Sequence, residues 1–238
     1  MPVLGLGVFQ SPPEETTAAA ETAIVNGYRL FDTAASYDNE REVGAAIRAS
    51  GIDRAEIFVT TKLWISDYGY DEALVGFEAC LRRLGLDYAD FFLLHQPVPT
   101  DLDRTVAVYT AMEKVLAAGR ARAIGVSNFS EQHLEQLMRR TEVVPAANQV
   151  ELHPFFTQQP LRAFHARHGI ATEGWSPLGG IHRYRPADPD AVLNALEHPT
   201  ITAIADKYGA RRRRRGCCAG TSSTRTGSPR TSTSSASS

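Results

Sequence analysis

The feature that most constrains the fold is a strict alternation of apolar runs with amphipathic stretches of helical period. Seven strand–helix units in this order indicate an α/β protein with a parallel sheet. A doubly wound sheet and a (β/α)8 barrel both fit this alternation. The predicted strands are Met1–Val8, Tyr28–Thr33, Ile57–Leu63, Tyr88–His95, Ala121–Asn128, Ala146–His153 and Ile170–Pro177. The predicted helices start at Pro12-Pro13 and continue with 40–48, 71–84, 102–118, 131–139, 160–168 and 200–209.

Polar or reactive residues follow the predicted strands, at the point where each strand ends. In a (β/α)8 barrel the carboxyl ends of the strands meet at one face and carry the active site. The positions of these residues therefore favour the barrel. They are Asp32 and Tyr37, Lys62, His95, Ser127-Asn128, Asn148-Gln149 and Glu151, and Trp175-Ser176.

Four of these residues suggest a proton-donating site. A tyrosine has an ordinary pKa of about 10, so a nearby cation is expected to help it act as an acid near neutral pH. Lys62 would supply that cation, and Asp32 would pair with Lys62 and keep it charged. We expect the lysine to pull the pKa of Tyr37 down. His95 would orient a carbonyl oxygen beside the phenol.

Six segments in order resemble the motifs of the aldo-keto reductases, particularly the 2,5-diketo-D-gluconate reductase type: FDTAASYDNE, TTKLW, FFLLHQP, IGVSNF, NQVELHP and GWSPLG. The resemblance covers residues 1–209. It implies a (β/α)8 TIM barrel that binds NADPH, with NADH possible, without a Rossmann fold. It further implies reduction of an aldehyde or ketone, with Tyr37, Asp32, Lys62 and His95 as the catalytic tetrad and Tyr37 as proton donor.

The resemblance also implies binding residues. Ser127, Asn128 and Gln149 match residues that bind the nicotinamide carboxamide, and Trp175 matches the aromatic residue that stacks on the nicotinamide ring. Positions near the pyrophosphate correspond to Ser176 and Leu178, and substrate would contact Phe9, Trp64 and His95. Gln96 stands where many relatives have tryptophan, so the width of the substrate pocket stays open.

The composition changes at Ala210. All 27 acidic residues precede this position, whereas seven of the 25 basic residues follow it, and residues 210–238 contain only Ala, Arg, Gly, Cys, Thr, Ser and Pro. Such a segment cannot bury a core, so a barrel domain over 1–209 and a disordered tail over 210–238 are expected. The codons of these seven amino acids all have G or C in the middle position, which favours a frameshifted reading; a natural basic tail is the alternative.

The predicted barrel is incomplete, because no eighth parallel strand and no loop for the adenosine 2′-phosphate follow. We therefore expect unpaired edges on the first and seventh strands, poor folding and weak NADPH binding. An in-frame gene product would be an active reductase. Two alternatives are an inactive fragment and a non-catalytic regulatory module on the same fold.

Other features exclude several classes of protein. No apolar run of membrane-spanning length and no signal-peptide pattern are present. Three cysteines, two of them adjacent, do not form a disulfide framework, which favours the cytoplasm. Arg211–Arg215 lacks interleaved aromatic residues, so a nucleic-acid arm is not expected. We expect a monomer that acts on a small carbonyl compound and needs no metal.

Overall fold

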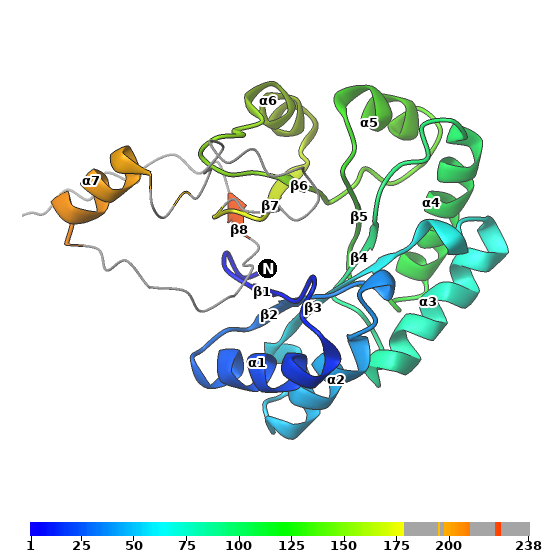
Figure 1. The fold of residues 1–238 in the computed structure, drawn as a ribbon. Coiled ribbons are helices and arrows are strands. Elements are labelled where there is room, and N and C mark those ends of the chain that lie inside the picture. The colour runs from blue at the N-terminus through cyan, green and yellow to red at the C-terminus, as the bar shows by residue number, and fades with distance from the viewer. Residues whose placement is uncertain (179–194, 196–197, 210–221, 225–238) are drawn as a thin grey trace, which may run out of the picture.

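The computed structural model describes residues 1–178, 195, 198–209 and 222–224. Within them, seven parallel strands follow one another in chain order around a strongly curved sheet (Figure 1). The strands are β1 (Leu6–Gly7), β2 (Leu30–Asp32), β3 (Phe58–Leu63), β4 (Phe91–Leu94), β5 (Ile124–Ser127), β6 (Ala147–Glu151) and β7 (Ala171–Trp175). This is the architecture of a (β/α)8 barrel that is not closed by an eighth parallel strand among the described residues.

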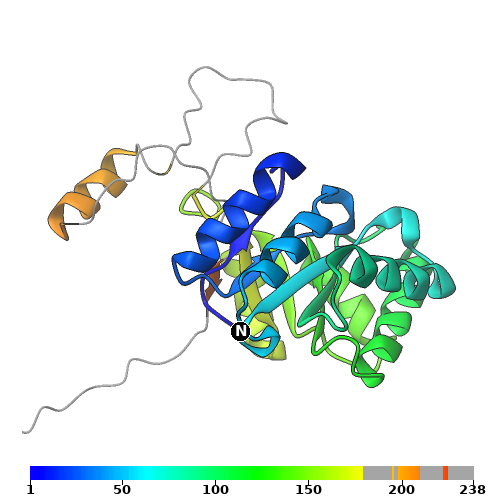
Figure 2. The ribbon, with the colours of Figure 1, turned by 90° about the horizontal axis from the view of Figure 1, so that it is seen from below.

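Helices cover the outside of the sheet. These are α1 (Pro13–Val25), α2 (Glu40–Ala49), α3 (Tyr70–Leu84), α4 (Leu102–Ala117), α5 (Glu131–Met138) and α6 (Gln159–His168). Three 3-10 turns lie in the connections: η1 (Ala35–Tyr37), η2 (Arg54–Glu56) and η3 (Ile65–Asp67). A further helix, α7 (Pro199–Lys207), lies apart from the barrel in both views (Figures 1 and 2).

Each strand contributes side chains to two packing layers, one between the sheet and the helices and one inside the barrel. This follows because neighbouring side chains on a strand point to opposite faces. On β4, Phe92 and Leu94 belong to the large cluster shared with α3 and α4. Phe91 and Leu93 instead pack inside the barrel against Ala147. A side chain at Gly125 on β5 would lie 2.6 Å from the Ala147 carbonyl oxygen and 2.8 Å from the Phe91 ring. The barrel interior therefore has room only for glycine at that position.

The predicted fold class is confirmed, and each predicted strand contains the observed one with residues to spare at one or both ends. The unexpected element is β8 (Ser222–Thr224), which pairs antiparallel with Thr172–Gly174 of β7. The sequence predicts an unpaired edge on the seventh strand and no regular structure at these three positions. Antiparallel pairing does not replace the parallel closing strand of a barrel, and no β8–β1 pairing is present in the described ranges. The boundary at residue 209 stays a prediction, because 210–221 and 225–238 lie outside the described residues.

A buried carboxylate at the start of β4 stabilises the barrel wall. Asp90 is 1% exposed; it accepts hydrogen bonds from Arg122 at 2.9 Å and the Val59 N–H at 3.0 Å, and it pairs with Arg54 at 2.7 Å. Asp90→Asn is expected to lower the free energy of unfolding by about 3 kcal/mol, because two cations lose a buried partner. Urea denaturation measures this. The control Asp87→Asn removes an exposed carboxylate and is expected to change stability by less than about 0.5 kcal/mol. Equal effects of the two substitutions would contradict the prediction.

Candidate active site

The structure brings Asp32, Tyr37 and Lys62 together at the carboxyl ends of β2 and β3. The Lys62 Nζ lies 2.5 Å from Asp32 Oδ1 and 3.3 Å from the Tyr37 hydroxyl, and it also donates to the Thr33 carbonyl oxygen at 3.2 Å. Lys62 is 1% exposed and Asp32 is 3% exposed. The ammonium group is therefore held between three oxygens, and one of them is the phenol.

The electrostatics of Tyr37 differ from the sequence-based prediction. Burial raises the pKa of Tyr37, and the Asp32 carboxylate raises it further, whereas Lys62 lowers it by its charge and its hydrogen bond. The net direction is upward, so the prediction of a lowered pKa is wrong for this structure. Burial alone would lower the pKa of Lys62, but Asp32 and Tyr37 raise it above its ordinary value, so the ammonium stays charged.

His95 follows β4 and completes the group. Its ring lies 5.5 Å from the Tyr37 ring and 4.9 Å from the Trp64 ring, both edge-on. Its Nδ1 is 3.4 Å from the Ser36 Oγ. Burial, and then the charge of Lys62, lower the pKa of His95 to about 3. The imidazole is therefore neutral at neutral pH, and a neutral ring can offer one N–H as a hydrogen-bond donor.

The expected nicotinamide residues form a second connected group at the ends of β5, β6 and β7. Asn128 donates to the His95 carbonyl oxygen at 2.9 Å and to the Ser127 Oγ at 3.1 Å, and it accepts from the Trp175 indole at 3.0 Å. Ser127 Oγ donates to the Gln149 carbonyl oxygen at 2.8 Å. Asn128 has a φ of 65°, a left-handed conformation that asparagine tolerates better than most residues. The Asn128 amide thus links the ends of β4 and β7.

Two residues join the groups in ways that the sequence analysis missed. The Gln149 side chain donates to Asp32 Oδ2 at 2.8 Å, across the barrel interior. Glu173 on β7 is buried, and its charge helps to raise the pKa of Lys62. Glu173 stands two residues before Trp175, so strand alternation alone placed it on the interior face. That signal was present in the sequence.

The remaining predicted residues lie at the rim. Phe9 is 38% exposed and its ring centroid is 5.0 Å from that of Tyr37. Ser176 has a φ of 49°, and Leu178 is 49% exposed. The Gln96 carbonyl accepts a hydrogen bond from Tyr68 at 2.7 Å, which fixes the backbone beside His95.

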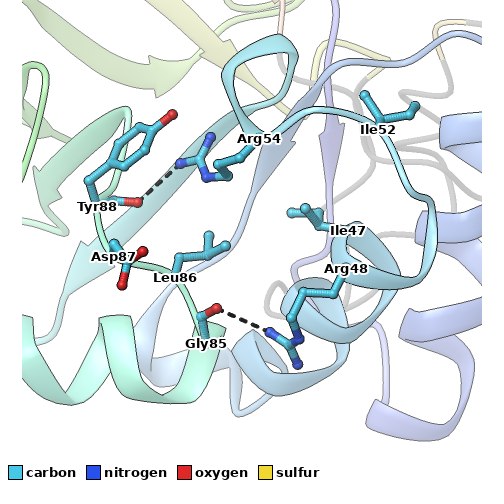
Figure 3. A pocket seen from close by; sticks show the side chains of 8 residues that line it. All are labelled: Ile47, Arg48, Ile52, Arg54, Gly85, Leu86, Asp87 and Tyr88. Carbon is cyan, nitrogen blue, oxygen red and sulfur yellow. Dashed lines mark hydrogen bonds between the residues drawn. The ribbon is translucent and has the colours of Figure 1, made fainter.

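A cavity of about 230 Å³ lies away from this group. It is formed by the end of α2 and by the loops that precede β3 and β4, at the opposite end of the strands, where a (β/α)8 barrel serves stability rather than catalysis (Figure 3). Its two arginines are engaged by backbone carbonyl groups: Arg48 binds those of Leu84 and Gly85, and Arg54 those of Ile57 and Tyr88. We therefore interpret the cavity as part of the scaffold.

In the part of the chain that the structure describes, no helix is both long and apolar enough to cross a bilayer. Within the same residues, no three His, Cys, Asp or Glu side chains gather as ligands for a metal ion.

A parallel barrel with a Lys–Asp–Tyr group and a neutral histidine at its carboxyl face defines a class of carbonyl oxidoreductases. The family model "Aldo/keto reductase family" matches residues 3–223. The chain belongs to the aldo/keto reductase family, whose members are oxidoreductases that use nicotinamide cofactors.

Individual relatives agree with this assignment. Morphine 6-dehydrogenase of Pseudomonas putida is 53% identical over 210 residues, which cover 88% of this chain and 71% of that protein. The crystal structure of an aldo/keto reductase from Brucella melitensis superposes with a TM-score of 0.79 at 45% identity, covering 86% of this chain and 73% of that chain. The crystal structure of an aldo-keto reductase from a Medee basin deep-sea metagenome library superposes with a TM-score of 0.80 at 38% identity, covering 88% of this chain and 73% of that chain.

Proposed function

We propose that the protein reduces an aldehyde or ketone to an alcohol with NADPH, and that Tyr37 donates the proton. The observation that carries the proposal is the position of the Lys62 ammonium, 2.5 Å from Asp32 and 3.3 Å from the Tyr37 hydroxyl. When bound, NADPH supplies a hydride to the carbonyl carbon. The phenol gives its proton to the carbonyl oxygen, and Lys62 stabilises the phenolate that is left.

The raised pKa of Tyr37 is compatible with this role. A reduced carbonyl oxygen is a far stronger base than a phenolate, so proton transfer from even a weak phenol is favourable. Lys62 then acts mainly by holding the hydroxyl in place and by stabilising the phenolate. A neutral His95 that accepts from Ser36 at Nδ1 carries its proton on Nε2 and can donate a hydrogen bond to the substrate oxygen.

The residues at the ends of β5 to β7 fit a nicotinamide. Asn128 Oδ1 and Ser127 Oγ each accept one hydrogen bond from the described residues and keep a second lone pair for a carboxamide N–H. The half-buried Trp175 indole is fixed at its N–H by Asn128 and presents a flat apolar surface. Ser176 and Leu178 would approach the pyrophosphate. Phe9 and Trp64 would form the apolar wall of the substrate site.

The direction of the reaction and the setting of the protein belong to the same proposal. The relative from Pseudomonas putida is named morphine 6-dehydrogenase, and a dehydrogenase oxidises an alcohol. This name supports the proposal that the same side chains of the present protein also catalyse the reverse reaction, oxidation of an alcohol to a carbonyl compound. We propose a cytoplasmic monomer that uses NADPH in preference to NADH. The direct test is oxidation of NADPH, followed at its nicotinamide absorbance, with small aldehydes and keto-sugars as substrates. Turnover with an aldehyde supports the proposal and overturns the sequence-based expectation of poor folding and weak NADPH binding. NADPH binding without turnover on any carbonyl would contradict the proposal.

The pKa directions predict the pH profile. Tyr37 must be protonated for reduction, and burial raises its pKa above the ordinary value of a tyrosine, so kcat for reduction is expected to stay flat from about pH 5 to about pH 9. Oxidation needs the phenolate, so its rate is expected to rise about tenfold per pH unit over the same range. His95 has a pKa of about 3, so its titration is expected to cause no change of slope in the pH profile over this range. Initial rates in both directions measure this, and a break near pH 6.5 in reduction would contradict it.

A further inference from the structure

One buried histidine outside the catalytic group has both ring nitrogens engaged. His165 lies on α6 with no exposed surface. Its Nε2 is 3.0 Å from the Asn148 side-chain nitrogen, and its Nδ1 is 2.8 Å from the Thr172 hydroxyl. Asn148 and Thr172 stand on β6 and β7, one position from Gln149 and Glu173, so they face the helices while those neighbours face the interior. The group therefore lies behind the barrel wall.

The orientation of the Asn148 amide fixes the protonation of this histidine. Asn148 Oδ1 accepts from the Phe129 N–H at 3.3 Å, and Asn148 Nδ2 donates to the Phe129 carbonyl oxygen at 2.8 Å. A flipped amide would place donor against donor and acceptor against acceptor. Because Nδ2 also faces His165 Nε2, that ring nitrogen must be an acceptor, and Nδ1 must carry the proton that Thr172 accepts. Burial lowers the pKa of His165 to about 4, in agreement with a neutral ring.

The same amide holds the turn that carries the expected nicotinamide residues. Phe129 directly follows Asn128, whose backbone is left-handed and whose N–H donates to the Gln149 carbonyl oxygen at 2.9 Å. Both backbone polar groups of Phe129 are bound by Asn148, and Phe129 as a whole is 1% exposed. The turn at Asn128 and Phe129 is thus fixed by two consecutive residues of β6, Asn148 on the side of the helices and Gln149 on the side of the barrel interior.

We propose that His165 is a positioning residue: by accepting a hydrogen bond from Asn148 it holds Phe129, and so Ser127 and Asn128, in the geometry that binds the nicotinamide carboxamide. The inference rests on the proposed function. His165 itself touches neither cofactor nor substrate. Without its acceptor nitrogen, Asn148 Nδ2 keeps one partner instead of two, and its amide is free to rotate away from Phe129.

The first experiment needs no cofactor. In the full chain labelled with 15N, the His165 ring is expected to show a protonated Nδ1 and an unprotonated Nε2 near neutral pH. In His165→Leu the Phe129 backbone amide resonance is expected to shift, and in His165→Gln it stays near the wild-type position, since glutamine offers both an acceptor and a donor. The opposite tautomer, a charged ring, or an unmoved Phe129 resonance would overturn the network.

The second experiment tests the link to the carboxamide. Dissociation constants are measured by tryptophan fluorescence for NADPH and for its 3-acetylpyridine analogue, which has a methyl group in place of the carboxamide nitrogen. The wild-type chain is expected to bind NADPH about tenfold more tightly than the analogue. In His165→Leu this ratio is expected to fall below about threefold, and His165→Gln is expected to restore it. The control His168→Leu makes the same change at an exposed position of α6 and leaves the ratio unchanged.

The outcomes separate the two proposals. A purely structural role for His165 would weaken both ligands by the same factor, leave the ratio at the wild-type value and overturn the inference alone. A wild-type chain that binds neither ligand would overturn the proposed function and the cofactor half of the inference together, whereas the tautomer of His165 would still be decided by its ring nitrogens.

Discussion

Replacing Tyr37 by phenylalanine is expected to lower kcat for carbonyl reduction about 10³-fold, since general acid catalysis contributes about 10²- to 10⁴-fold. The substitution removes one hydroxyl and leaves the ring, which still packs against Phe9 at 5.0 Å and His95 at 5.5 Å. Lys62 keeps its bond to Asp32. The dissociation constant for NADPH is therefore expected to change by less than about twofold. Steady-state rates at saturating aldehyde and a fluorescence titration measure the two quantities.

The matched control is Tyr70→Phe, which removes the same hydroxyl from a residue 37% exposed at the start of α3 and is expected to leave both quantities unchanged. Tyr37→Phe with more than about a tenth of the wild-type rate would exclude Tyr37 as the proton donor. If catalysis is lost while a biological effect persists, the protein acts as the regulatory module considered above.

The strand ends explain why much of the site could be predicted from sequence. Asp32, Lys62 and His95 each follow an apolar run, and parallel strands bring their carboxyl ends to one face whatever their separation along the chain. The register then sets the rest: Asp32 pairs with Thr60, so Lys62 stands two residues beyond it on the next strand and on the same face. The spacing of the apolar residues and the order of the strands along the chain were therefore sufficient to predict that Asp32, Lys62 and His95 lie at one face of the barrel.

Other features depend on competing energies or on distant side chains. The sign of the Tyr37 pKa shift depends on burial against the charge of Lys62, and a sequence shows the charge but not the desolvation. The hydrogen bond from Gln149 to Asp32 joins residues 117 positions apart, across the barrel interior. The sequence around His165 carries no sign of its role, because its partners Asn148 and Thr172 lie on two strands that only the fold brings beside α6. The three residues of β8 have no apolar pattern that predicts a strand.

The second large effect concerns the buried ion pair. Lys62→Met is expected to lower the free energy of unfolding by about 3 kcal/mol, because the Asp32 carboxylate stays buried without its cation. The same substitution removes the charge that stabilises the phenolate of Tyr37, and kcat is expected to fall about 10²- to 10³-fold, as for the loss of one preorganised donor. Urea denaturation and steady-state kinetics measure these effects separately.

A double variant separates stability from catalysis. Asp32→Asn with Lys62→Met removes both charges, and the asparagine can still accept from the Gln149 amide that now binds Asp32 at 2.8 Å. Stability is therefore expected to return to within about 1 kcal/mol of wild type, since a buried ion pair replaced as a pair costs little. Activity is expected to stay low, because no cation faces the Tyr37 hydroxyl. Recovery of both would mean that Lys62 serves only to neutralise Asp32, and recovery of neither would mean that its bond to the Thr33 carbonyl shapes the turn that carries Tyr37.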